Sequence, residues 1–131
     1  MNCSVVESAS APRAIGPYSQ AIELKVGDTR MLYTSGQIPL DPVTGNLVEG
    51  GIDVATERVM NNLQAVLAAA RMDFSHVVKT TIFLVDLADF AKVNEVYGRA
   101  FTAAPPARST VQVAALPKGA RVEIEMVAAR T

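Results

Sequence analysis

The sequence predicts an α+β fold, in which a mixed β-sheet carries two helices packed on one face. Apolar and polar residues alternate with period 2 near both ends of the chain, as strands require. Two internal segments repeat instead with the helical period of 3.6, and a short apolar run separates them. The expected order is therefore two strands, a helix, a strand, a helix and two strands. The 131 residues suit a single domain over 1–131, with the Ser- and Ala-rich residues 1–13 loosely held.

The first two strands are predicted to form a hairpin. Residues 22–26 and 30–34 alternate in character, and Gly27-Asp28 between them is typical of a tight turn. A rigid Gly16-Pro17 turn precedes this hairpin and is followed at once by Tyr18. We expect the Tyr18 ring to be half-buried at the strand edge or held over a pocket.

Residues 54–71 are predicted to form the first helix. Apolar residues recur at helical spacing, namely Val59, Leu63, Val66, Leu67 and Ala70. Asp53 is a plausible N-cap because its carboxylate can accept from the first free backbone N–H groups. Asn61, Asn62 and Gln64 are expected on the solvent side.

The second helix is expected to begin at residues 86–89. Its predicted buried stripe consists of Phe90, Val93, Tyr97, Ala100 and Phe101. Asn94 lies at the edge of that stripe, where an amide is either solvated or turned toward a pocket.

Residues 77–86 form the strongest predicted strand, and both of its faces are apolar. Ile82 and Leu84 point one way, while Phe83 and Val85 point the other. Because two helices cover only one face of the sheet, the face that carries Phe83 would be exposed in a monomer. We expect identical subunits to bury it in a closed oligomer.

A second hairpin is predicted at the C-terminus, after Pro105-Pro106 stops the helix. Arg108 would lie at its open end, and Glu123 on the returning strand opposite residues 110–112. Period 2 sends Val122, Ile124 and Met126 to one face and Glu123, Glu125 and Val127 to the other. On spacing alone, Glu123 either faces solvent or belongs to a site.

Charge and composition argue against several classes of function. The net charge is −1 and no two basic residues adjoin, which disfavours nucleic acid as the main partner. One cysteine, Cys3, and one histidine, His76, supply neither an internal disulfide nor the usual zinc ligands. The chain has no membrane-length apolar run, and residues 1–15 lack a signal-peptide pattern. We expect a soluble, cytoplasmic protein without metal or cofactor.

Several motifs resemble those of the reactive-intermediate deaminase family, within it the RidA subgroup, from about residue 11 to the end of the chain. They are Ile15-Gly16-Pro17-Tyr18-Ser19-Gln20-Ala21, Ser35-Gly36-Gln37-Ile38-Pro39, Lys79-Thr80-Thr81-Ile82-Phe83-Leu84, Val93-Asn94-Glu95-Val96-Tyr97, Pro106-Ala107-Arg108-Ser109, Leu116-Pro117-Lys118-Gly119 and Val122-Glu123-Ile124-Glu125. The resemblance implies a chorismate-mutase-like (YjgF-like) fold and a homotrimer with three clefts between subunits. It also implies hydrolysis of 2-imino acids, or their enamine tautomers, to 2-oxo acids and ammonium.

The resemblance further implies which residues form the site: Arg108, Glu123, Tyr18, Ser35 and Asn94. Thr110 stands where the family often has cysteine, and that position is expected to contribute mainly through its backbone. Residues 102–106 form a shorter loop than in many relatives, so the size of the preferred substrate is open.

The chemistry of an imino acid suits these side chains. The Arg108 guanidinium can hold a carboxylate through two parallel hydrogen bonds. Glu123, in a shielded cleft that raises its pKa, can orient water and carry its proton. Tyr18 would pack on the substrate, with Ser35 and Asn94 as polar walls. The alternative is an Arg108–Glu123 ion pair that only joins two strands.

Two further functions stay open at this point. Some members of the family are described as ribonucleases or translation inhibitors, although scattered basic residues disfavour RNA here. A trimer that binds small carboxylic acids, as a sensor or chaperone-like protein without catalysis, is the other alternative.

Overall fold

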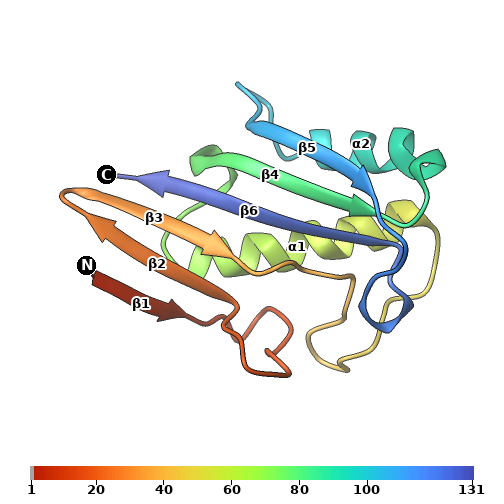
Figure 1. Ribbon diagram of the computed structural model, residues 1–131, viewed down its shortest axis with the longest axis horizontal. Helices are drawn as coiled ribbons and strands as arrows, with labels where there is room; N and C mark the ends of the chain where they lie inside the picture. Colours follow the sequence, from red (N-terminus) through yellow and green to blue (C-terminus); the bar gives the residue numbers. More distant parts are fainter. Residues whose placement is uncertain (1) are drawn as a thin grey trace.

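The computed structural model describes residues 2–131 and shows one mixed sheet with two α-helices on the same face (Figure 1). The strands are β1 (Asn2–Val6), β2 (Ala21–Val26), β3 (Thr29–Thr34), β4 (Val77–Leu84), β5 (Ala107–Gln112) and β6 (Val122–Arg130). The helices are α1 (Ile52–Ala69) and α2 (Phe90–Gly98). The strand order is β1-β2-β3-β6-β4-β5, parallel only between β4 and β5. The predicted α+β class is confirmed.

The N-terminal segment contains a strand that the sequence did not predict, because β1 falls within residues 1–13, which were expected to be loosely held. Met1 lies outside the described residues. β1 pairs with β2 at the sheet edge. The buried Gln20 amide then fixes the following chain, because its nitrogen donates to the carbonyls of Pro12 (2.8 Å) and Ser8 (3.2 Å). Its oxygen accepts from the Ser8 N–H at 2.6 Å. One polar side chain thus anchors the segment that leads to Tyr18.

The C-terminal hairpin was also predicted wrongly. β5 pairs in parallel with β4, and β6 lies between β3 and β4. The connection passes the end of β4, where Val113 N–H donates to Leu84 O (2.8 Å) and Val85 N–H to Arg121 O (3.2 Å). The central position suits β6, since its residues Val122, Ile124, Met126 and Ala128 are almost fully buried. The alternation along β6 itself is as predicted.

Helix α1 covers the sheet with its apolar side and begins two residues earlier than predicted. Gly51 is the N-cap, and Asp53 lies in the first turn without a capping hydrogen bond. Asn62 is fully buried, so its predicted solvent position is wrong. Its amide nitrogen donates to the carbonyls of Leu40 (2.9 Å) and Ile38 (3.4 Å). Asn62 therefore joins α1 to the segment 38–40.

Helix α2 lies over β4 and β5 and buries Val93 and Tyr97, as predicted. Phe90, at its first position, is 38% exposed and is not part of the buried stripe. The Tyr97 hydroxyl shares a buried hydrogen bond with Thr80 of β4 (2.7 Å), which fixes the helix against the sheet.

The opposite face of the sheet, turned toward the viewer in Figure 1, carries no helix. We call it the open face. Strand register and burial assign to it eight apolar residues, namely Val5, Ile22, Leu24, Met31, Tyr33, Phe83, Val111 and Val127. Its polar residues include Lys79, Thr81, Glu123 and Glu125. Val5, Tyr33 and Val111 are 58%, 45% and 42% exposed. An uncovered, partly apolar face is present in the single chain, as expected; its burial between subunits stays a prediction.

Candidate active site

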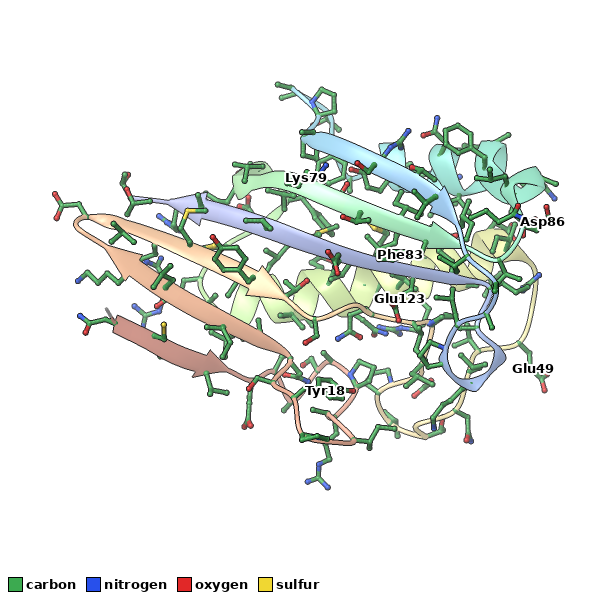
Figure 2. The ribbon with its side chains drawn as sticks, in the orientation of Figure 1. Tyr18, Glu49, Lys79, Phe83, Asp86 and Glu123 are labelled. Atoms are coloured by element: carbon green, nitrogen blue, oxygen red, sulfur yellow. The ribbon has the colours of Figure 1, made fainter. Side chains whose placement is uncertain are left out.

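Glu123 lies on the open face of β6, beside Phe83 of β4 (Figure 2). Its carboxyl group rests on the backbone of Gly36: a Cβ added at that glycine would come within 2.8 Å of the Glu123 carboxyl carbon and Oε2. The segment after β3 is held there by two backbone hydrogen bonds, Gln37 N–H to Ile124 O (2.9 Å) and Ile124 N–H to Gln37 O (3.1 Å). The absence of a side chain at Gly36 thus makes room for the carboxyl group.

The surroundings of Glu123 disfavour its charged form. Burial raises the pKa of the Glu123 carboxyl, and the neighbouring carboxylate of Glu125 raises it further. Among residues 2–131 no hydrogen bond or ion pair to the Glu123 side chain is recorded. A carboxyl group with a raised pKa and free oxygens is well placed to exchange a proton with a small molecule.

A hollow of about 370 Å³ opens in front of this carboxyl group. We call it the Glu123 pocket; its inner wall is formed by Tyr18, Ser35, Gly36, Gln37, Ile38 and Glu123. The Ser35 hydroxyl donates to the carbonyl of Ser19 (2.6 Å), which leaves its oxygen free to accept. The Tyr18 hydroxyl accepts from the Ile15 N–H (3.4 Å), and the ring is 51% exposed. Three of the six predicted site residues thus line one cavity.

Arg108 lies elsewhere, on the helix side of the edge strand β5 and opposite Thr80 of β4. Its Nη1 donates to Asn94 Oδ1 of α2 at 2.6 Å. The guanidinium also lies over the rings of Tyr97 and Phe90, with Cζ 5.1 and 5.5 Å from their centroids. These contacts fix its position beside a second hollow of about 430 Å³, the Arg108 pocket, lined by Asn94, Tyr97, Gly98, Phe101, Pro105, Pro106 and Arg108.

Thr110 is two residues after Arg108 and faces the same side of β5. Its buried hydroxyl oxygen has no hydrogen-bond partner within the described chain. The structure therefore brings Thr110 and Asn94 to the Arg108 side, and Tyr18 and Ser35 to the Glu123 side.

Within one chain the two groups lie on opposite faces of the sheet. Strand β4 separates β5 from β6, and Glu123 occupies the face that α2 does not cover. In residues 2–131 no ion pair joins Arg108 to Glu123, so the alternative of a strand-joining pair is not realised in the single chain. Sequence reasoning missed the roles of Gly36, Phe90 and Tyr97, although a glycine directly after a strand signals a close approach.

Two further structural observations concern alternative site types. Within residues 2–131, no three His, Cys, Asp or Glu side chains gather where they could hold a metal ion. None of the described helices is both long and apolar enough to cross a membrane.

This fold is that of a known family of proteins. Residues 8–130 match the family model described as Endoribonuclease L-PSP, and the chain belongs to this family, which includes RidA. The chain is 62% identical to Protein DfrA of Myxococcus xanthus over 123 residues, which cover 94% of this chain and 92% of that protein. It is 50% identical to the human 2-iminobutanoate/2-iminopropanoate deaminase over 124 residues, 95% of this chain and 88% of the human protein.

Solved structures agree with this assignment. The crystal structure of E. coli TdcF with bound serine superposes with a TM-score of 0.88 at 40% identity, covering 98% of this chain and 99% of that one. RidA from an Antarctic Psychrobacter superposes with a TM-score of 0.86 at 45% identity, covering 95% and 98%. The predicted resemblance to the RidA subgroup is confirmed.

Proposed function

We propose that this protein is a 2-iminobutanoate/2-iminopropanoate deaminase, which hydrolyses reactive imines or enamines of amino-acid metabolism to 2-oxo acids and ammonium. The observation that carries the proposal is the Glu123 carboxyl group, seated on Gly36 with a raised pKa and free oxygens in a pocket with Tyr18 and Ser35. The deaminase names of relatives near 50% identity support it. The reaction needs neither metal nor cofactor, and we place it in the cytoplasm.

The reaction follows from the groups available. Water adds to the carbon of the protonated C=N bond while the Glu123 carboxylate takes one proton from that water. Glu123 then gives this proton to the nitrogen of the resulting carbinolamine. Its C–N bond breaks as C=O forms, and the hydroxyl proton released in this step passes to the leaving ammonia to give ammonium. Arg108 holds the substrate carboxylate through two parallel N–H donors. Because imines are already reactive, orientation and one proton carrier suffice.

The complete site requires two copies of the chain. Arg108 and Glu123 open on opposite sides of one sheet, so a single copy does not present both to a small imino acid. We infer that Arg108, with Asn94 and Thr110, faces the Glu123 pocket of an adjacent copy. The open face, with its exposed Val5, Tyr33 and Val111, is a suitable contact surface for a homotrimer.

The test is hydrolysis of freshly generated 2-iminobutanoate, compared with its spontaneous decay. Arg108→Lys should lose most of the activity with the fold intact, since a point charge does not replace the two-pronged guanidinium. Glu123→Gln should still bind 2-oxobutanoate but turn over slowly. Glu49→Gln, an exposed carboxyl group outside both pockets (Figure 2), is the matched control. Wild-type protein that binds 2-oxobutanoate without accelerating hydrolysis would favour the non-enzymatic binding function instead.

The family description leaves an endoribonuclease as the other candidate. The protein is purified until its imine-hydrolysing activity per milligram is constant, and ribonuclease activity is then measured on the same material. A ribonuclease activity that co-purifies and disappears in Glu123→Gln would contradict the proposal, whereas one that is lost on purification would belong to a contaminant.

A further inference from the structure

Two basic residues line the Glu123 pocket on the side that adjoins a second hollow, and we call this side the mouth of the pocket. Arg13 and Lys118 both line this pocket, and both also line an adjoining hollow of about 400 Å³ together with residues 42–45. The two cations thus stand at the boundary between the reacting carboxyl group and a second open volume. Arg13 belongs to the N-terminal segment and Lys118 to the connection between β5 and β6, so the two residues are far apart in the sequence.

Neither cation is engaged by the protein. Within residues 2–131 no ion pair or hydrogen bond is recorded for the Arg13 guanidinium or the Lys118 ammonium group. Other arginines differ: Arg30 pairs with Glu23 at 2.7 Å, and Arg99 with Glu95 at 3.4 Å. Arg13 also borders a hollow that Glu7 lines, but no contact between the two is recorded. Both charges remain available to a ligand.

The backbones that carry these cations are fixed. Pro12 is buried, and its carbonyl accepts from the Gln20 amide, so the chain entering Arg13 is anchored. Lys118 has the left-handed conformation (φ 58°, ψ 17°), in a turn closed by Ala120 N–H donating to Pro117 O at 3.1 Å. A residue other than glycine is uncommon there. The turn therefore carries a charged side chain at a position where the backbone conformation is unfavourable for any residue other than glycine.

We propose that Arg13 and Lys118 form a second anion-binding site at the mouth of the Glu123 pocket, which selects imino acids bearing a carboxylate at the far end of their side chain. This inference rests on the proposed deaminase function. Arg108 of an adjacent copy would hold the α-carboxylate, the reacting carbon would face Glu123, and the distal carboxylate would lie between the two cations. Imines derived from acidic amino acids are thus a second substrate class, beside the short aliphatic imines of the proposed function.

The electrostatic argument concerns the second charge of such a substrate. The Glu123 carboxylate repels an anionic side chain, and this repulsion grows in a partly buried pocket. Two unpaired cations at its mouth offset the repulsion, whereas a short aliphatic imine makes no use of them.

Equilibrium binding tests this with two ligands of the same size. We expect the wild-type protein to bind 2-oxoglutarate more tightly than 5-methyl-2-oxohexanoate, in which a neutral isopropyl group replaces the distal carboxylate. The double variant Arg13→Gln/Lys118→Gln should reduce that preference about tenfold, which corresponds to about 1.4 kcal/mol. Lys118→Arg in the Arg13-containing protein should retain it. An equal affinity for both ligands in the wild type, or an unchanged preference in the double variant, would overturn the inference.

Steady-state kinetics are the second test, and they distinguish failure of the second anion-binding site from failure of the proposed deaminase function. The ratio of kcat/KM for 2-iminoglutarate to that for 2-iminobutanoate should fall about tenfold in the double variant. Lys92→Gln, an exposed cation on α2, should leave the ratio unchanged. Lys118→Gly removes the charge but suits the left-handed backbone. A loss of selectivity in this variant would therefore not reflect a damaged turn. If 2-iminobutanoate is hydrolysed but the ratio does not move, only the second anion site fails; if neither imine is hydrolysed, the proposed function itself fails.

Discussion

At the scale of single residues, the Glu123 carboxyl group lies directly against Gly36. The carboxyl group occupies the space that any larger residue at position 36 would need. Since the clash would be with the free end of Glu123, that side chain would turn away while the backbone remains in place. The contact therefore links a small residue after β3 to the position of the Glu123 carboxyl group on β6.

Gly36→Ala should accordingly separate activity from stability. We expect imine hydrolysis to fall on the order of 100-fold because the carboxyl group is displaced. The free energy of unfolding should change by less than about 1 kcal/mol, since a flexible side chain can move. Steady-state kinetics and urea denaturation measure the two effects. Unchanged turnover would show that the position of Glu123 against Gly36 does not matter for the reaction.

The Glu123 pKa predicts how stability depends on pH. Burial holds the pKa of this group above its ordinary value of 4.5, so the folded protein retains the proton to higher pH than the unfolded chain. The contribution to stability is thus fully present below pH 4.5 and is lost as the pH rises through the folded pKa. Glu123→Gln should be more stable than wild type at pH 8, and the gap should close near pH 4.

The gain is expected to stay below about 1 kcal/mol, because Glu123 is only partly buried and water screens its charge. Denaturation at the two pH values, with Glu49→Gln as the control, measures it. A Glu123→Gln protein that is less stable than wild type at pH 8 would contradict the assignment of a desolvated, unpartnered carboxyl group.

At the scale of elements, sequence patterns predicted local structure better than pairing. The β2–β3 hairpin and both helices follow from short-range periodicity, and the structure confirms them. The C-terminal hairpin was wrong because alternation defines two faces of a strand but not its neighbours; β4, about 40 residues upstream of β6, takes the place between β5 and β6. Composition likewise did not reveal that Gln20 holds residues 8–12.

The same limit explains the partial prediction of the site. Resemblance supplied all six candidate residues, but only the fold shows that they form two groups on opposite faces. Asn62 was missed because an amide beside other polar residues on a helix resembles a solvated position. Only the long-range bonds to Ile38 and Leu40 distinguish it from Asn61.

Asn62 therefore gives a prediction at the level of elements. Asn62→Ala removes the hydrogen bonds to the carbonyls of Leu40 and Ile38 and the one accepted from Arg58 Nε (3.0 Å), so we expect a loss of about 2–3 kcal/mol in unfolding free energy. Because Ile38 and Leu40 also line the Glu123 pocket, the KM for the imine should rise as well. Asn61→Ala, exposed on the neighbouring position of α1, is the matched control. Equal stability of the two variants would contradict a tethering role for Asn62.

At the scale of the whole molecule, the division of the site between two faces gives a test by subunit mixing. Arg108→Lys and Glu123→Gln proteins should each be nearly inactive alone. When they are unfolded and refolded together, some sites combine an intact Arg108 from one chain with an intact Glu123 from another. Random assortment should restore about a quarter of wild-type activity. No recovery, despite mixed oligomers in native mass spectrometry, would contradict a site shared between copies.

The separation of Arg108 from Glu123 by the thickness of the sheet also has a consequence for how the protein responds to its own abundance. With the shared site proposed above, a chain on its own would lack either Arg108 or Glu123 at each pocket, so turnover per molecule should fall steeply on dilution below the dissociation constant of the assembly. Cells that make little of the protein would then have almost no capacity to clear imines, while a modest rise in expression would produce a disproportionate gain.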